Sequence, residues 1–207
     1  CLVVWADDRG VDTGRGEDIY ARLVGADGVP AGRAWRISGA AATGDERCPA
    51  VAFAGTDAWG QPDGMYLVVW QDDRNGDWDI YAQLLWADTG TPIVEDLRVS
   101  DTAFDDFCGD VTYSGATNQF FVVWEDHRRP ARGADIYGRL VNPWDGALAG
   151  ASVRLSGPAA IADETHPAVA WANDDASGAP VGQFLAVWED GRDYIEGRQI
   201  DIYGQRV

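Results

Sequence analysis

An acidic loop holds the densest set of oxygen ligands in this chain. Residues 72 to 79 read Asp-Asp-Arg-Asn-Gly-Asp-Trp-Asp, which places four carboxylates and one side-chain amide within eight residues. Calcium is bound in proteins by about six to eight oxygen atoms, and the loop lacks the spacing and the closing Glu of an EF-hand. A calcium site is therefore one interpretation of this loop, with the ligands Asp72, Asp73, Asp77 and Asp79.

Three residues with softer ligand atoms occupy matching places in a repeated pattern: Cys48, Cys108 and His166. Each follows an acidic pair and precedes an apolar segment. If that segment is the innermost strand of a sheet, the three side chains surround a central channel, where sulfur and nitrogen ligands suit Zn²⁺ or a similar ion. The competing interpretation is a small, half-buried and chemically inert position. The sequence favours the inert interpretation, because a fourth ligand is missing.

Enzyme signatures are scarce. His127 and His166 are the only histidines, and GxSxG, Walker A and CxxC motifs are absent. Pairs of carboxylates can hydrolyse glycosides, but a chain with 34 acidic residues contains such pairs by chance. Trp59, Trp78 and Trp144 lie in segments rich in Gly and Asp, where an exposed ring can stack on a sugar. Carbohydrate is therefore a candidate ligand beside protein.

Composition excludes several classes of partner. The 207 residues are 46% hydrophobic, enough to bury one large core, and the formal charge of −18 repels a phosphate backbone, so we expect no nucleic acid. No apolar run is long enough to span a bilayer. Three cysteines make no disulfide framework.

One sequence unit returns four times along the chain. Its first anchor is an apolar segment ending in Trp5, Trp70, Trp124 or Trp188, and its second is the triplet Asp-Ile-Tyr. Two further anchors appear three times each: an Arg-x-Ser segment, as at residues 97–100, and a segment of the Pro-Ala-Val-Ala type, as at residues 49–52. All four are short, rich in β-branched and aromatic residues, and bounded by Gly, Asp, Asn or Pro, as strands are.

Polar residues follow each Trp at fixed distances. An Asp stands two residues after it, an Arg four residues after it, and the Asp of Asp-Ile-Tyr lies across the following loop. We expect the Arg to pair with a carboxylate while the Asp closes the turn. Because the set recurs in every repeat, it predicts a network that staples the sheets together rather than a catalytic site. Its members are Asp7, Arg9, Asp18, Arg74, Asp126, Arg128, Asp135, Asp190, Arg192 and Asp201, together with Asp72 and Asp79 of the acidic loop.

The repeats predict an all-β fold. A four-stranded antiparallel unit in tandem buries both of its faces only against its neighbours, as the blades of a β-propeller do. We therefore expect one propeller domain of about four blades over residues 1–207, with a β-sandwich as the alternative. The chain begins and ends inside a unit, so it supplies fourteen of sixteen strands. Three explanations stay open: four imperfectly closed blades, a fragment of a longer propeller, or closure by strands of another chain. Unpaired edges at its ends would invite self-association.

The motif Val-Val-Trp-Glu-Asp-Gly-Arg with Asp-Ile-Tyr-Gly-Gln-Arg-Val at residues 186–207, where Ala186 replaces the first Val, resembles the tandem repeats of large secreted or cell-surface bacterial proteins. That resemblance implies a β-propeller and an extracellular location, but no common activity. The prediction for function is a non-catalytic binding or scaffold module of an exported protein. An extracellular glycosidase or sialidase-like propeller enzyme is the alternative, and a unique cluster of acids would favour it.

Overall fold

The computed structural model describes residues 1–9, 16–39, 42–55, 64–157, 162–174, 180–192 and 199–207. Within them, fourteen strands form four antiparallel sheets, which confirms the predicted all-β class. No helix in this part of the chain is long and apolar enough to cross a membrane. The first sheet holds β1 (Leu2–Asp7), β2 (Asp18–Val24) and β3 (Pro30–Arg36); the second holds β4 (Glu46–Ala54), β5 (Met65–Asp72), β6 (Asp79–Trp86) and β7 (Pro92–Arg98). The third holds β8 (Asp106–Ser114), β9 (Gln119–Asp126), β10 (Asp135–Val141) and β11 (Leu148–Arg154); the fourth holds β12 (Glu164–Asp174), β13 (Pro180–Asp190) and β14 (Asp201–Arg206).

The sequence anchors occupy equivalent places in the four sheets. Each Trp that ends an apolar segment pairs across the sheet with the Tyr of the next Asp-Ile-Tyr triplet, as Trp70 does with Tyr81 and Trp124 with Tyr137. In the same hairpins the two repeated aspartates lie directly opposite each other, as Asp72 and Asp79 do. Equivalent register in every sheet follows from side-chain alternation, because a slip of one residue would turn the apolar set away from the core.

The hydrophobic core is divided among the three junctions between consecutive sheets. In each cluster the Ile of one sheet's Asp-Ile-Tyr packs with the Trp of the following sheet: Ile19 with Trp70, Ile80 with Trp124, and Ile136 with Trp188. In the second and third sheets, one face therefore belongs to the preceding junction and the other face to the following one. In the fourth sheet, Ile202 is 70% exposed because no following sheet lies against it in this chain.

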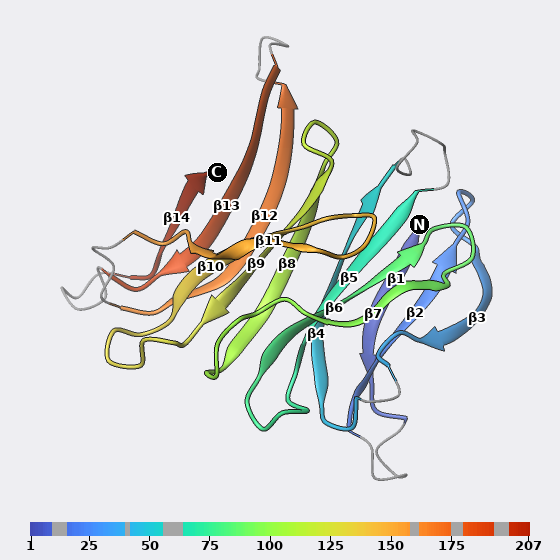
Figure 1. Cartoon of the computed structure of the whole chain (residues 1–207), viewed down its shortest axis with the longest axis horizontal. Helices are drawn as coiled ribbons and strands as arrows, with labels where there is room; N and C mark the ends of the chain where they lie inside the picture. Colours follow the sequence, from blue (N-terminus) through green and yellow to red (C-terminus); the bar gives the residue numbers. More distant parts are fainter. Residues whose placement is uncertain (10–15, 40–41, 56–63, 158–161, 175–179, 193–198) are drawn as a thin grey trace.

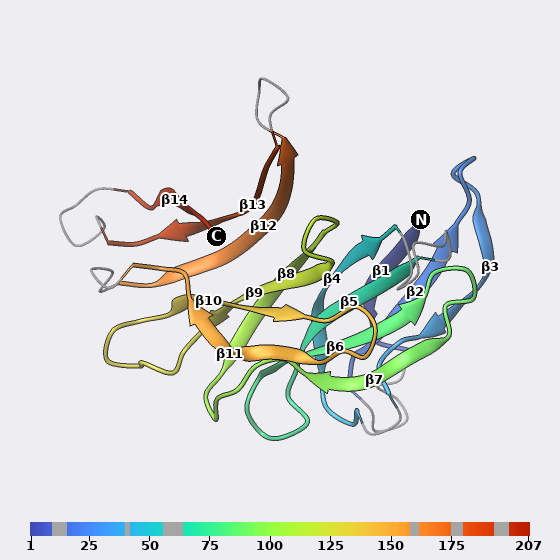
Figure 2. The ribbon, with the colours of Figure 1, turned by 45° about the horizontal axis from the view of Figure 1, so that its top comes forward.

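The sheets follow one another in an open arc. β1, β4, β8 and β12 contact one another in sequence along its inner side. Figures 1 and 2 show the first sheet, in blue, and the fourth sheet, in red, at opposite ends of the molecule. The predicted succession of propeller-like blades is therefore present, but the first and fourth sheets do not close a four-bladed ring.

A close contact in the third sheet adjusts the repeat to a larger side chain. Phe121 stands where the second sheet has Leu67, and Gly138 stands where it has Ala82. A Cβ atom at Gly138 would lie 2.6 Å from Cζ of Phe121, closer than two carbon atoms approach. The glycine therefore makes room for the aromatic ring.

We expect Gly138→Ala to destabilise the protein by about 1–3 kcal/mol, as overpacking of a core does. Adding Phe121→Leu should restore most of that loss, because leucine with alanine is the combination found in the second sheet. Chemical denaturation of the two single variants and the double variant measures the coupling. Gly115→Ala is the matched control, since a Cβ atom there meets no atom within 4 Å. Equal losses in the Gly138→Ala and double variants would contradict the explanation.

Candidate functional site

The repeated polar motif forms the same structural contact in each sheet. In the second sheet Nε1 of Trp70 donates to Asp72 Oδ2 at 3.1 Å, and Arg74 donates to both oxygens of Asp72 at 2.9 and 2.5 Å. The Arg74 guanidinium also stacks 4.2 Å from the centre of the Tyr81 ring. The equivalent pairings in the other sheets involve Asp7 with Arg9, Asp126 with Arg128, and Asp190 with Arg192. Because these contacts recur in every sheet and the oxygens of each Asp are already bonded to Arg and Trp, they indicate a structural network that stabilises each hairpin rather than a reactive site.

The other repeated aspartate has a different partner from the one that the motif suggests. Asp79 accepts from Nη2 of Arg98 at 2.5 Å and from the hydroxyl of Ser100, both from the Arg-x-Ser segment of its own sheet. Asp18 pairs with Arg36 and Asp135 with Arg154 in the same way. No role for these arginines was predicted from the sequence. Their recurrence two residues before a serine in three repeats could have indicated that they pair with this aspartate. Asp201 is exposed in the fourth sheet.

A third buried acid lies between each pair of consecutive sheets. Glu46, Asp106 and Glu164 are fully buried and stand opposite Asp72, Asp126 and Asp190 in the register. Burial, together with the charges of neighbouring aspartates, raises the pKa of Glu46 and that of Glu164 to about 7. Burial and the charge of Asp126 also raise the pKa of Asp106. These acids therefore favour the protonated form in the folded protein.

The acidic loop does not bring its four carboxylates together as calcium ligands. Asp72 pairs with Arg74 and Asp79 with Arg98, while Oδ1 of Asp73 accepts from the backbone N–H of Asp45 at 2.7 Å. In the part of the chain that the structure describes, no three His, Cys, Asp or Glu residues gather in a way that could hold a metal ion. The positive charges next to Asp72 and Asp79 are therefore the guanidinium groups of Arg74 and Arg98. Calcium binding stays a prediction, tested by melting in CaCl₂ against NaCl of equal ionic strength.

The innermost strands share a β-bulge at the same place. The register shifts between Arg47 and Ala50, between Phe107 and Asp110, and between Thr165 and Ala168. Each bulge holds a non-glycine residue in the left-handed region: Cys48 at φ 50°, Cys108 at φ 41° and His166 at φ 52°. This conformation is costly for residues with a side chain and is concentrated at functional sites. The bulges thus turn the side chains of Cys48, Cys108 and His166 toward the edge of the arc where β4, β8 and β12 begin, which we call the rim.

The three re-aimed residues are the predicted channel residues. The structure brings two of them together: Sγ of Cys108 lies 3.1 Å from Sγ of Cys48, on neighbouring sheets. Nδ1 of His166 instead lies 3.1 Å from the Thr165 hydroxyl and 3.5 Å from Oε2 of Glu189. Within the described residues the three do not form a metal-ligand set. The ring is therefore a thiol pair with a separate imidazole.

The variable positions of the motif face the same rim. The residue between Trp and Asp is Gln71, Glu125 or Glu189, and it lies opposite Arg47, Phe107 or Thr165 of the bulged strand. The residue between Asp and Arg is Asp73, His127 or Gly191 in the same three sheets. The staple is thus identical from sheet to sheet while the rim beside it differs. A unique set of side chains on a repeated framework is what a reactive site requires.

One imidazole at this rim is held by a carboxylate. Nε2 of His127 lies 2.8 Å from Oε1 of Glu125, and its ring packs edge-on against Phe107 at 5.1 Å between centres. The hydrogen bond to Glu125 raises the pKa of His127, and the charges of Asp163 and Asp105 add to the effect. The arrangement provides a proton donor that is charged over a wider pH range than an isolated histidine.

A hollow of about 420 Å³ lies against the fourth sheet. Asp163, His166, Glu189 and Ile200 are among its lining residues. Oδ1 of Asp163 accepts from the backbone N–H of Ala134 at 3.0 Å, and the charge of Asp163 is among the influences that raise the pKa of His127. Both histidines of the chain and the carboxylates of Glu125, Asp163 and Glu189 are therefore grouped along one rim.

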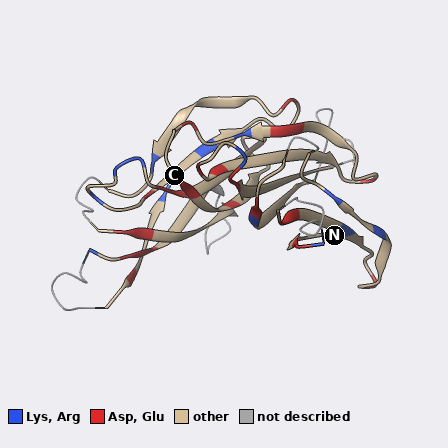
Figure 3. Ribbon diagram, turned by 90° about the horizontal axis from the view of Figure 1, so that it is seen from below, with Lys and Arg blue, Asp and Glu red and all other residues tan. Residues whose placement is uncertain are grey.

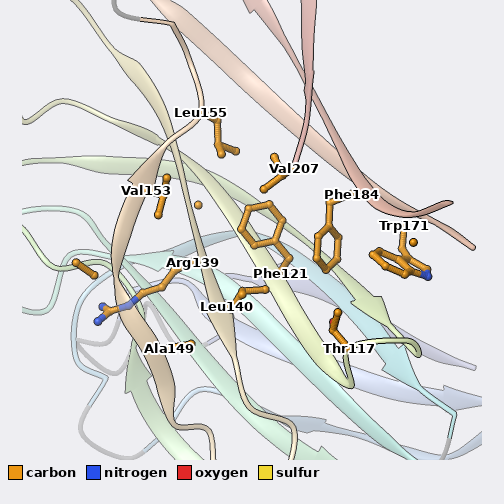
Figure 4. A pocket seen from close by; sticks show the side chains of 13 residues that line it. Thr117, Phe121, Arg139, Leu140, Ala149, Val153, Leu155, Trp171, Phe184 and Val207 are labelled. Atoms are coloured by element: carbon orange, nitrogen blue, oxygen red, sulfur yellow. The ribbon is translucent and has the colours of Figure 1, made fainter.

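A second hollow, of about 300 Å³, lies between the third and fourth sheets and is apolar. Figure 4 shows Phe121, Phe184 and Trp171 around it, with Leu140 and Thr117. Its only charged lining residue, Arg139, donates to the carbonyls of Val99 and Gly150. It carries no acid or base, so the rim remains the candidate site.

The tryptophans predicted as sugar platforms have different surroundings. Trp78 is half-buried between Arg47 and Phe107, with the Arg47 guanidinium 5.7 Å from the centre of its ring. Trp144 packs against the core between the second and third sheets. Trp59 lies outside the described residues. Of the two described tryptophans, Trp78 lies at the rim and Trp144 does not.

Comparison with known proteins gives a fold and no family. No family model matches the chain, and no curated protein matches it. Among solved structures, it is similar to an N-acetylgalactosamine deacetylase from F. plautii bound to blood group B trisaccharide, with a TM-score of 0.51, 12% identity and 91% of this chain covered. An endo-arabinase from Bacteroides thetaiotaomicron and a thermostable family-43 glycoside hydrolase follow with a TM-score of 0.48 each and identities of 13% and 10%; they cover 93% and 94% of this chain. The chain spans 58%, 66% and 62% of the three structures, in that order.

The comparison corrects one prediction. We expected a non-catalytic scaffold, but the solved structure that this chain resembles with a TM-score of 0.51 is that of an enzyme, a deacetylase, which speaks against that expectation. At 12% identity the likeness concerns the fold and carries no residue assignments. The chain has a propeller-type arrangement of four β-sheets with one chemically distinct rim.

Proposed function

We propose that this chain is part of an extracellular β-propeller enzyme that hydrolyses glycosidic bonds of a neutral glycan. The observation that carries the proposal is that both histidines, His127 and His166, stand at positions where the other repeats carry different residues, with Glu125 2.8 Å from His127 and Glu189 3.5 Å from His166. A site that differs between repeats is selected separately from the framework that holds it.

The chemistry follows from the side chains present. Glycosidic hydrolysis needs an acid that protonates the leaving oxygen and a base or nucleophile on the other side of the bond. His127, whose pKa is raised by its hydrogen bond to Glu125, supplies the acid. Glu189 lines the hollow beside His166 and supplies the base that takes a proton from the attacking water. The glycosidic C–O bond breaks, the leaving oxygen takes the proton of His127, and the oxygen of water bonds to the anomeric carbon after Glu189 takes its proton.

Charge limits the substrate. The chain has a formal charge of −18, and Figure 3 shows Asp and Glu along ribbons across the molecule rather than at one place. A field of this sign opposes the approach of anionic polysaccharides. The exposed part of half-buried Trp78, next to Arg47 at the rim, supplies aromatic surface for contact with a sugar ring. A neutral glycan is the substrate class that agrees with both features.

The test is release of reducing ends from neutral polysaccharides and oligosaccharides by the purified protein. We expect Glu189→Gln and His127→Asn to abolish the release without changing the melting midpoint by more than a few degrees. Glu95→Gln makes the same chemical change on exposed β7, away from the rim, and should keep full activity. No release above a protein-free control, or equal rates in the Glu189→Gln and Glu95→Gln variants, would refute the proposal.

The role of Glu125 is tested separately from activity. Its hydrogen bond is the largest influence that raises the pKa of His127. Glu125→Gln should therefore lower that pKa, and any activity should decline at a lower pH on the alkaline side. NMR titration of His127 measures the shift directly, with Glu95→Gln as the control. An unchanged His127 titration would show that Glu125 does not position the proton.

A further inference from the structure

The thiol pair on the inner side of the arc is not used by the proposed reaction. Cys48 belongs to β4 and Cys108 to β8, the innermost strands of the second and third sheets, and their sulfur atoms lie 3.1 Å apart. Both residues sit in bulges with fixed left-handed backbone conformation. The backbone N–H of Cys108 also donates to Oε1 of Gln71 at 3.0 Å. The sulfurs are therefore held together by two sheets rather than by mobile loops.

The two thiols are electrostatically unequal. Cys108 donates a hydrogen bond to the sulfur of Cys48, which lowers the pKa of Cys48, and the charges of Arg47 and His166 lower it further. The same contact raises the pKa of Cys108. Cys48 is exposed and Cys108 is half-buried. The accessible sulfur is thus the one that more readily becomes a thiolate, the reactive form in thiol–disulfide exchange.

We propose that Cys48 and Cys108 form a reversible disulfide that links the second and third sheets, by exchange with a small-molecule disulfide of the glutathione type. The Cys48 thiolate attacks one sulfur of that disulfide, the old S–S bond breaks, and one small thiolate leaves. Cys108 then loses its proton and attacks Sγ of Cys48, which expels the second small thiolate. Two protein thiols are oxidised and one small disulfide is reduced to two thiols.

The bridge would act on the junction between the sheets. It joins residues 60 positions apart, so it restricts the unfolded chain over a long loop. The expected rise in Tm is roughly 10 °C for a domain of this size. Cys1 is excluded as a partner because it lies beside Val51, Ala52 and Phe53, toward the end of β4 opposite to Cys48, and its amino group donates to the carbonyl of Val24. An oxidising compartment, as proposed for the enzyme, is where such a bridge persists.

Oxidised glutathione, followed by intact-mass measurement and peptide mapping, tests the proposal. The protein should lose the mass of two hydrogen atoms, give one cross-linked peptide containing Cys48 and Cys108, and return to the dithiol with dithiothreitol. Cys108→Ser should stop at a glutathione adduct on Cys48, and Cys1→Ser should behave as the unmodified protein. Stable adducts on both residues without a cross-link, a bridge to Cys1, or no reaction at all would overturn it. Peptide mapping of the oxidised protein without substitutions shows whether the Cys48–Cys108 cross-link forms, even if a variant fails to fold.

Discussion

Asp72→Asn should lower the free energy of unfolding by about 3–5 kcal/mol, the cost of breaking a buried ion pair by removing one partner. Asp72 is fully buried, and the Arg74 side chain is only 9% exposed. The substitution keeps the size of the side chain but removes the charge that Arg74 and the indole N–H of Trp70 share. The arginine is left partly paired, through Asp96 alone.

Asp7→Asn is the matched control for this prediction. Asp7 makes the same contacts to Trp5 and Arg9 in the first sheet, but the Arg9 side chain is 52% exposed and water can replace the pairing. Its loss should be much smaller than that of Asp72→Asn. Urea denaturation of both variants at pH 7 measures the difference. Equal losses would mean that the motif stabilises by local turn geometry instead of by buried charge.

Stability should fall by about 2–3 kcal/mol for each of two buried glutamates as the pH rises from about 4.5 to about 7.5. Glu46 and Glu164 titrate near their ordinary value of 4.5 in the unfolded chain but at about 7 in the folded protein. Across this window the folded state binds more protons than the unfolded state, so rising pH favours unfolding. Above the folded pKa both states have released the proton and the loss is complete.

Neutral isosteres of these acids test the effect. Glu46→Gln with Glu164→Gln should be more stable than the unmodified protein at pH 8 and should remove most of the decline in the urea midpoint. Asp106→Asn should act at still higher pH, since burial raises that pKa as well. His127 contributes a loss in the same direction as it deprotonates, because its pKa is also raised. Glu95→Gln controls for surface charge. A urea midpoint of the protein without substitutions that stays the same from pH 5 to pH 8 would contradict the prediction.

The two predictions are linked through one contact. The charge of Asp72 is among the influences that raise the pKa of Glu46. Asp72→Asn should therefore also lower the pKa of Glu46 and weaken the decline of stability with pH. The penalty of the substitution should thus be smaller at pH 8 than at pH 5. Measuring the variant at both values separates the loss of the arginine pair from the relief of carboxylate repulsion.

The candidate site could be predicted from the sequence only in part. Cys48, Cys108 and His166 were recognised as equivalent, because each precedes the same type of strand. Their separation into a thiol pair and an imidazole depends on neighbouring sheets, which a repeat pattern does not describe. Glu125 and Glu189 were overlooked, since they occupy the variable positions of the motif, where a search for recurrence finds nothing.

The sequence by itself determined the strands and their pairing. Four recurring anchors with alternating apolar residues define which residues form each hairpin and which face is buried, since a one-residue slip would expose the whole apolar set. Trp70 opposite Tyr81, and the recurrence of Asp72 with Arg74, follow from that local regularity. Both lie within one hairpin, where distances depend on a few neighbouring residues.

Only the tertiary structure decided which residues of different sheets meet. The bulges at Cys48, Cys108 and His166 turn three side chains to the rim through a left-handed backbone conformation that those residue types do not indicate. The arc then sets the angle between sheets, which brings Ala134, before β10 of the third sheet, into hydrogen-bond contact with Asp163 of the hollow at the fourth. Such contacts depend on the packing of whole sheets, which side-chain alternation along a single strand does not specify.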